Sequence, residues 1–455
     1  MVILMGFKEN FAWGAATASY QNEGGYREDG KGLSVWDVFT HEKGRVEDGR
    51  NGDIASDQYH RMGEDAAIMQ ELSMNAYRFS LAWPRILPEG TGKICEKGLD
   101  FYDRMVDDLL SRNITPYITL FHWDLPYELY KKGGFLNPDM PKWFAEYTKI
   151  VMDRLSDRVD HWITQNEPQC YIGSGLASGI HAPGVKMNKQ DYLQAAHQSL
   201  LSHGQAVSVI KSRAKMKPVI GYAPAAWWLW SPVSEDPKDI EACRKQTFNA
   251  AEDQVGGSAW WMDPVYLGKY PESGVKNVEQ YMPVIGAEDM ALISQPIDFL
   301  GINVYQTYLG KAGEDGECIT QDRRIGYDKT AYPWPVTPQA LYWGPKFFRE
   351  RYNTQIIVTE NGLSNSDWVH LDGKVHDPQR IDFTHRYLKE LKRAADEGID
   401  IGGYFHWTLT DNFEWATGYS NRFGLVYVDF ETQKRIIKDS GYWYKSVIES
   451  NGRII

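Results

Sequence analysis

Two glutamates stand directly after apolar runs of the chain, where a carboxyl group would have few solvent contacts. Glu167 lies in residues 164–168 (TQNEP) and Glu360 in residues 359–362 (TENG). A buried carboxylate is costly unless it is paired or used, so each glutamate taken alone fits a structural ion pair as well as a catalytic role. Two of them at different strand ends of one fold favour glycoside hydrolysis, which uses a pair of carboxyl groups.

Four further strand ends carry residue types that are common in catalytic sites. Any one of these side chains could be hydrogen-bonded in a purely structural role. Chance is a poor explanation for residues of catalytic type at the ends of six strands. The six strand ends hold Arg78, His122 with Trp123, Asn166 with Glu167, Asn303 with Tyr305, Glu360 with Asn361, and Trp407.

The elements that position these residues alternate between short apolar runs and longer stretches of helical periodicity. Strands are predicted at 11–15, 75–81, 115–123, 161–166, 219–223, 299–305, 355–360 and 402–407. Helices are predicted at 63–72, 98–112, 141–158, 189–212, 338–352 and 382–398. Such alternation implies a parallel sheet with right-handed crossovers. We expect an α/β fold: a single-domain (β/α)₈ TIM barrel over residues 1–455, with extended βα loops and its site at the strand ends.

Composition and charge exclude several classes of protein. The 455 residues are 42% hydrophobic and 24% charged, which is typical of a globular protein. The net charge of −12 argues against nucleic acids and anionic membranes as partners. Residues 1–6 are too short and uncharged for a signal peptide, and no apolar run is long enough to span a membrane. The cysteines form no CxxC pair, so we expect reduced thiols in the cytoplasm.

The chain resembles glycoside hydrolase family 1, the family of β-glucosidases and β-galactosidases on (β/α)₈ barrels. An N-E-P triplet alone would be weak evidence, but several blocks occur in the family's order and cover almost the whole chain. They are residues 11–21 (FAWGAATASYQ), 77–80 (YRFS), 120–126 (LFHWDLP), 411–415 (DNFEW) and 422–425 (RFGL).

The resemblance implies a role for each site residue. Glu167 would be the general acid/base, and Glu360 the nucleophile of a retaining double displacement. Arg78 and Tyr305 would keep Glu360 ionised, with Asn303 as further support, and Asn166 would contact the sugar 2-hydroxyl. The substrate-binding residues would be Gln21, His122, Trp123, Trp334, Trp407, Glu414, Trp415 and Phe423. Among them, Trp407 would stack beneath the sugar ring, Phe423 would close the 6-position, and Trp334 would line the leaving-group subsite.

No metal or cofactor is expected, since a neutral sugar needs polar side chains and flat aromatic rings. His122 could ligate a metal, but a sugar contact is favoured because Asp124 is the one possible ligand near it on its strand. No phosphate-binding glycine loop supports a cofactor-dependent barrel enzyme. Residues 227–230 (WWLW) could line the entrance for the leaving group or simply pack over the barrel rim.

Three relatives with other activities are weighed against a β-glucosidase. A 6-phospho-β-glucosidase would carry serine in place of Glu414, whose charge would repel a phosphate. A non-catalytic sugar-binding protein would lack one of the two glutamates, and a thioglycosidase would lack Glu167. We therefore expect hydrolysis of β-glucosides, with β-galactosides and β-fucosides also accepted, and small β-glycosides or short oligosaccharides from cellulose as partners. The leaving group and the oligomeric state stay open.

Overall fold

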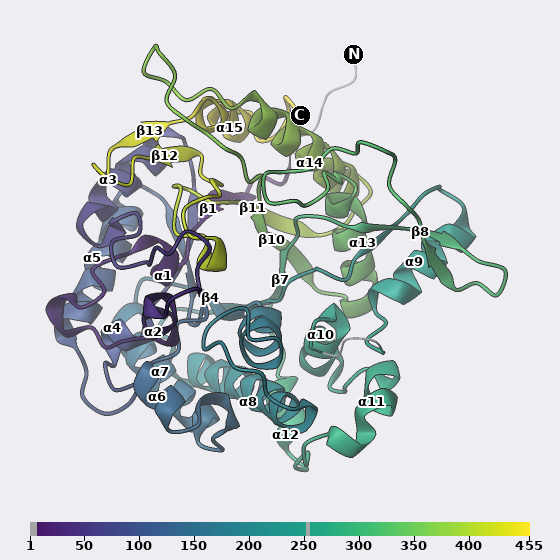
Figure 1. Ribbon diagram of the computed structural model, residues 1–455, viewed down its shortest axis with the longest axis horizontal. Helices are drawn as coiled ribbons and strands as arrows, with labels where there is room; N and C mark the ends of the chain where they lie inside the picture. The colour runs from purple at the N-terminus through teal and green to yellow at the C-terminus, as the bar shows by residue number, and fades with distance from the viewer. Residues whose placement is uncertain (1–6, 252–254) are drawn as a thin grey trace.

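The computed structural model describes residues 7–251 and 255–455, which form a closed parallel barrel of eight strands (Figure 1). Each barrel strand pairs with the next one along the chain, and the last pairs with the first. The strands are β1 (Ala12–Ala16), β2 (Ala76–Ser80), β3 (Thr115–Thr119), β4 (His161–Asn166), β5 (Val219–Ala223), β7 (Phe299–Asn303), β10 (Gln355–Asn361) and β11 (Ile401–Trp407). The predicted (β/α)₈ barrel is confirmed.

Helices surround the barrel and cover the outer face of its strands (Figure 1). The six predicted helices are present, with ends shifted by up to five residues: α3 (Gln58–Glu71), α5 (Glu96–Ser111), α7 (Met140–Leu155), α8 (Lys189–Arg213), α13 (Ala340–Tyr352) and α14 (Pro378–Asp396). Besides four short helices in the first loops, the helices that were not predicted are α9 (Pro237–Thr247), α10 (Ser258–Leu267), α11 (Glu272–Val278), α12 (Asp289–Ile293) and α15 (Asp439–Glu449). Helix α10 is almost entirely buried and contains Pro264, so it lacks the amphipathic pattern by which a helix is recognised.

Apolar side chains from all eight strands form one cluster in the barrel interior. Gly221 leaves the space that the Phe299 ring occupies, because a Cβ on Gly221 would lie 2.2 Å from that ring. The cluster closes the barrel below the strand ends, so the interior is packed rather than open. It includes Ala12, Ala76, Tyr117, Ile163, Ala223, Phe299, Ile357 and Phe405.

Two strands end two or more residues earlier than predicted. Strand β3 ends at Thr119 rather than at Trp123, whose backbone turns into the left-handed region at φ 79°. Strand β7 ends at Asn303, two residues before Tyr305. In both places the aromatic residue belongs to the loop above the barrel. The hydrophobic run continues past the last residue that pairs with a neighbouring strand. A prediction from hydrophobicity alone therefore placed the strand end too late.

The βα loops are long, as predicted, and contain structure of their own. Strands β6 (Trp230–Pro232), β8 (Tyr308–Ala312) and β9 (Cys318–Thr320) form a small sheet, and β12 (Val426–Val428) pairs with β13 (Arg435–Ile437). Short helices α1 (Ser19–Asn22), α2 (Val35–His41), α4 (Trp83–Ile86) and α6 (Tyr127–Lys131) lie in the first three loops, and a π-helical segment, Gln169–Ala177, follows β4. These loops build the walls above the barrel.

None of the described helices combines the length and the apolar composition that a membrane span requires. Residues 1–6, which showed no signal-peptide pattern, lie outside the described residues.

Candidate active site

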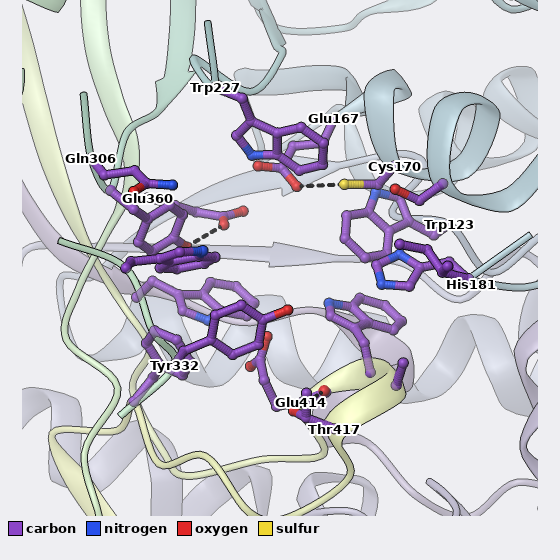
Figure 2. A pocket seen from close by; sticks show the side chains of 18 of the residues that line it. Trp123, Glu167, Cys170, His181, Trp227, Gln306, Tyr332, Glu360, Glu414 and Thr417 are labelled. Atoms are coloured by element: carbon purple, nitrogen blue, oxygen red, sulfur yellow. Dashed lines mark hydrogen bonds between the residues drawn. The ribbon is translucent and has the colours of Figure 1, made fainter. Parts of the chain in front are cut away.

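A cavity of about 350 Å³ lies above the carboxyl ends of the barrel strands. Glu167, Glu360 and Glu414 reach it from different sides (Figure 2). The predicted residues that line it are His122, Trp123, Glu167, Tyr305, Trp334, Glu360, Trp407, Glu414, Trp415 and Phe423. The other predicted residues, Gln21, Arg78, Asn166 and Asn303, are fully buried and contact this wall from behind.

Glu360, at the end of β10, is held by a cation and a phenol. Arg78 Nη1 donates to its Oε1 at 2.6 Å, and the Tyr305 hydroxyl donates to its Oε2 at 2.8 Å. Burial raises the pKa of Glu360, and the Arg78 charge and both hydrogen bonds oppose that rise. These contacts orient both carboxylate oxygens and favour the ionised form, as a nucleophile requires.

Glu167 faces the same cavity in a different environment. The Cys170 thiol donates to its Oε2 at 3.2 Å (Figure 2). Burial, and next the charge of Glu360, raise the pKa of Glu167 to about 8. Glu167 therefore carries a proton at neutral pH while Glu360 is stabilised as an anion. Two carboxyl groups whose surroundings separate their pKa values in this way can act as an acid and a nucleophile.

Asn166 joins the strand ends into one network. Its Oδ1 accepts hydrogen bonds from Arg78 Nη2 and, at 3.0 Å, from Asn303 Nδ2. Its Nδ2 must then donate to His122 Nε2, 3.0 Å away. Burial, and next the Arg78 charge, hold the pKa of His122 well below its ordinary value, so the ring is neutral and its proton lies on Nδ1.

Two of the buried polar atoms that lack a hydrogen-bond partner among the described residues belong to His122 and Gln21. They are His122 Nδ1, which carries the proton, and Gln21 Oε1. Gln21 Nε2 donates to Glu414 Oε2 at 3.2 Å. Buried polar atoms rarely stay unpaired, so these two are suited to the hydroxyls of a ligand.

Glu414 differs from its expected state. The sequence led us to expect a carboxylate, but burial, and next the charge of Glu360, raise the pKa of Glu414 to about 8. At neutral pH its carboxyl group therefore carries a proton, so it can donate one hydrogen bond as well as accept others. The expected repulsion of a phosphate is correspondingly weaker. None of the described residues lining the cavity is lysine or arginine, so no cation there would attract a phosphate either.

Three lining residues hold a backbone conformation that side chains other than glycine seldom adopt. Trp123, Glu167 and Trp415 have φ values of 79°, 41° and 51°. Such residues persist where the surrounding structure enforces them, and they cluster at functional sites. The Trp123 and Trp415 rings then stack at 4.2 Å and form a flat wall.

Several lining residues were missed, because they lie in loops beyond the strand ends. Cys170 follows Glu167 by three residues, and its backbone N–H donates to the Glu167 carbonyl at 2.8 Å, so that spacing could have identified it. The others include Ile180, His181, Gln306, Tyr308 and Tyr332. Residues 227–230 divide between lining the cavity and packing over the barrel rim. Trp227 lines the cavity, whereas Trp230 stacks on Tyr308 at 4.7 Å.

Within residues 7–251 and 255–455, no group of three or more histidine, cysteine or acidic side chains could hold a metal ion. The four cysteines are free thiols. Cys243 and Cys318 lie 75 residues apart in sequence, yet their sulfur atoms are 3.9 Å apart. The sequence spacing did not reveal this pair, because the fold brings α9 against the β6–β8–β9 sheet.

Comparisons with known proteins agree with this geometry. The chain is 44% identical to a 1,4-beta-D-glucan glucohydrolase of Thermotoga neapolitana, over 98% of this chain and 99% of that protein. It is 38% identical to an aryl-phospho-beta-D-glucosidase of Bacillus subtilis, over 98% of each chain. A solved beta-glucosidase from Thermotoga maritima in complex with glucoimidazole superposes with a TM-score of 0.90, at 44% identity over 98% of this chain and 99% of that one. The model of glycosyl hydrolase family 1 matches residues 4–453, and the chain therefore belongs to that family.

Proposed function

We propose that this protein is a retaining β-glucosidase that hydrolyses terminal, non-reducing β-D-glucosyl residues. The observation that carries the proposal is the pair of unlike carboxyl groups in one cavity. Glu360 is held by Arg78 and Tyr305, while Glu167 has a pKa raised to about 8. Relatives of similar length at 43–44% identity are named as glucosidases or glucan glucohydrolases, which supports the same activity.

The reaction takes two displacements at the anomeric carbon. Glu360 attacks that carbon while the protonated Glu167 gives its proton to the departing glycosidic oxygen, and a glycosyl ester forms on Glu360. Glu167, now ionised, then takes a proton from water, which attacks the ester and releases glucose with its β configuration. The Glu360 carboxylate is the leaving group of this second step, and Arg78 and Tyr305 stabilise it by donating hydrogen bonds.

The sugar would lie with its hydroxyls against Gln21, His122 and Glu414. The unpaired His122 Nδ1 and Gln21 Oε1 support such contacts, because sugar hydroxyls would satisfy both atoms. Trp407 would stack on the ring, with Trp415 and Phe423 at the 6-position end and Trp123 behind His122. Asn166 would contact the 2-hydroxyl, Asn303 would support Asn166, and Trp334 would face the leaving group.

The natural substrate would be a small β-glycoside, such as a short oligosaccharide derived from cellulose or an aryl glucoside, with β-galactosides and β-fucosides also accepted. We further propose that residues 1–455 act as one domain in the cytoplasm. The free cysteines support a reducing compartment.

A 6-phospho-β-glucosidase is the second candidate, and the aryl-phospho-beta-D-glucosidase relative at 38% identity favours it. A dianionic phosphate needs cations, whereas none of the described lining residues is lysine or arginine and Glu360 among them is stabilised as an anion. The neutral substrate therefore fits the cavity better.

A rate panel with proton NMR of the first product tests the proposal. The panel uses nitrophenyl β-glucoside, β-galactoside, β-fucoside and 6-phospho-β-glucoside. We expect the β-glucoside to be hydrolysed, the phosphorylated substrate to be nearly inert, and β-glucose to appear before its α anomer. A preference for the phosphorylated substrate would favour the second candidate, and α-glucose as first product would exclude Glu360 as nucleophile.

A further inference from the structure

Six charged side chains form one buried cluster beneath the loop that follows β11, and none of them lines the cavity. We call it the ionic cluster. Five of its six side chains are at most 1% exposed, and the sixth, that of Arg422, is 15% exposed. Its members are Asp367, Asp377, Arg380, Asp411, Arg422 and Lys438.

The cluster connects segments that are distant in sequence. Asp367 and Asp377 lie in the loop after β10, which is the strand of Glu360, and Arg380 lies in α14. Asp411 and Arg422 lie in the loop after β11, and Lys438 directly precedes α15. Figure 1 shows α14 and α15 on the same side of the barrel as β10 and β11.

Asp411 closes the base of the loop at residues 408–425. Its Oδ1 accepts a hydrogen bond from the backbone N–H of Gly424 at 3.0 Å, and its Oδ2 accepts one from Arg422 at 2.6 Å. Both ends of the loop are thereby tied to one carboxylate. Glu414 follows Asp411 by three residues, and Phe423 follows Arg422 directly, so the loop that presents both side chains to the cavity starts and ends at this carboxylate.

Lys438 links that carboxylate to the rest of the cluster. Its Nζ contacts Asp411 Oδ1 at 2.7 Å and Asp367 Oδ2 at 2.6 Å. Arg380 Nη2 also contacts Asp367 Oδ2, at 2.7 Å, and donates to the Arg422 carbonyl at 2.9 Å. The ammonium thus joins the loop after β10 to the loop after β11.

The charges of the cluster balance: three aspartates face two arginines and one lysine. Loss of the lysine charge would leave one carboxylate uncompensated in a buried environment, where breaking an ion pair is strongly unfavourable. Asp411 would then have to move toward solvent or take up a proton. Either change would alter the base of the loop that carries Glu414.

We propose that Lys438 is a positioning residue for recognition of the sugar's 6-hydroxyl end. Its ammonium fixes Asp411, and Asp411 sets the loop at residues 408–425 so that Glu414 and Phe423 meet the sugar. The proposal rests on the proposed β-glucosidase function. Lys438 itself touches no substrate, and the effect of its charge is transmitted through one carboxylate.

The test compares two substrates that differ at one hydroxyl: nitrophenyl β-glucoside and its 6-deoxy analogue. In Lys438→Met we expect kcat/KM for the glucoside to fall about tenfold or more, and for the 6-deoxyglucoside to fall much less. The preference for the 6-hydroxyl should shrink as it does in Glu414→Ala. Adding Lys438→Met to Glu414→Ala should change the preference little, because both substitutions disturb the same contact.

Two further variants separate positioning from folding. Lys438→Met with Asp411→Asn restores the charge balance without the lysine–aspartate contact, so thermal stability should recover while the lost preference should not. Asp263→Asn removes another buried carboxylate, which pairs with Arg351 at 2.6 Å between α10 and α13. It should lower stability while leaving the preference at the wild-type value.

An equal loss of kcat/KM on both substrates in Lys438→Met would overturn the proposal and reduce Lys438 to a structural role. Recovery of the preference together with stability in the double variant would overturn it as well. Failure of the proposed β-glucosidase function can be distinguished from failure of the Lys438 proposal, because the wild-type protein would then not hydrolyse the glucoside.

Discussion

The floor and the mouth of the cavity are built in different ways. At the floor, defined by His122, Glu167, Glu360, Trp407, Trp415 and Phe423, residues are at most 6% exposed. At the mouth, defined by Ile180, Trp227 and Tyr308, exposed fractions are 61%, 36% and 44%. The floor residues stand at strand ends or in the loop at residues 408–425. The mouth residues stand in longer loops and beside the small β6–β8–β9 sheet.

This difference separates two tasks. The floor is hydrogen-bonded through Asn166, Arg78 and Gln21, so each polar atom has a defined direction and can discriminate among hydroxyls. The mouth offers apolar and aromatic surface, which favours flat or apolar groups without demanding one geometry. We infer a narrower requirement for the sugar than for the leaving group.

The largest effect should follow substitution of the floor's nucleophile. Glu360→Ala should reduce kcat/KM on nitrophenyl β-glucoside by about 10⁴-fold or more, since the covalent step is lost. Azide, a small anion that can occupy the vacated space, should restore turnover and yield the α-glucosyl azide.

Initial rates and NMR of the azide product provide the check. The control is Glu350→Ala, an exposed carboxylate on α13, which should keep wild-type activity. If azide yields the β-azide, or if the substituted enzyme keeps most of its activity, Glu360 is not the nucleophile.

The second effect concerns the proton donor and depends on the leaving group. Glu167→Ala should slow hydrolysis of a poor leaving group by about 10²–10⁴-fold. With dinitrophenyl β-glucoside, the rate of the first displacement should fall far less, because that leaving group needs no proton. Pre-steady-state rates on both substrates measure the contrast, and equal losses would assign the proton to another residue.

The floor could largely be predicted from sequence because its chemistry stands at strand ends. The alternation of apolar runs with helical stretches defines those ends, and a parallel barrel brings them together. Motif order then identified Gln21 and Glu414, which lie in loops. The proton on Glu414 was not predictable, because it depends on how closely the protein packs around its carboxyl group and on the nearby Glu360.

The mouth was predictable only in part. His181 and Tyr332 belong to loops whose paths depend on tertiary packing, and neither residue carries a local pattern. Helices α10–α12 were missed for a related reason: α10 is almost entirely buried, and α11 and α12 are only seven and five residues long. Tertiary contacts rather than periodicity determine such segments.

The third effect is a pH dependence that the floor should impose. Glu167 acts as an acid only while protonated, and its pKa is raised to about 8. At pH values above this pKa, kcat/KM should therefore fall about tenfold per pH unit. On the acid side it should fall as Glu360 becomes protonated.

Glu414 also has a pKa raised to about 8, so a variant must identify the source of the alkaline limb. Wild-type enzyme and Glu414→Gln, measured with nitrophenyl β-glucoside, should show that limb, whereas Glu167→Gln, measured with dinitrophenyl β-glucoside, should not. The reverse result would assign the limb to Glu414 and to binding of the sugar rather than to proton transfer.

The smallest effect should come from the mouth. Trp227→Ala removes an aromatic face that lies beside Glu167 (Figure 2) and lines the cavity. An aromatic contact contributes about 0.5–1.5 kcal/mol beyond the area that it buries, so kcat/KM for an aryl β-glucoside should fall about 2- to 12-fold. Methyl β-glucoside, whose leaving group is too small to reach the ring, should be hydrolysed at the wild-type rate. Trp368→Ala, at a tryptophan 61% exposed and outside the cavity lining, is the matched control and should change neither rate. A larger loss on the methyl glucoside than on the aryl glucoside would mean that Trp227 supports Glu167 rather than the leaving group, and the separation of floor and mouth would fail at that residue.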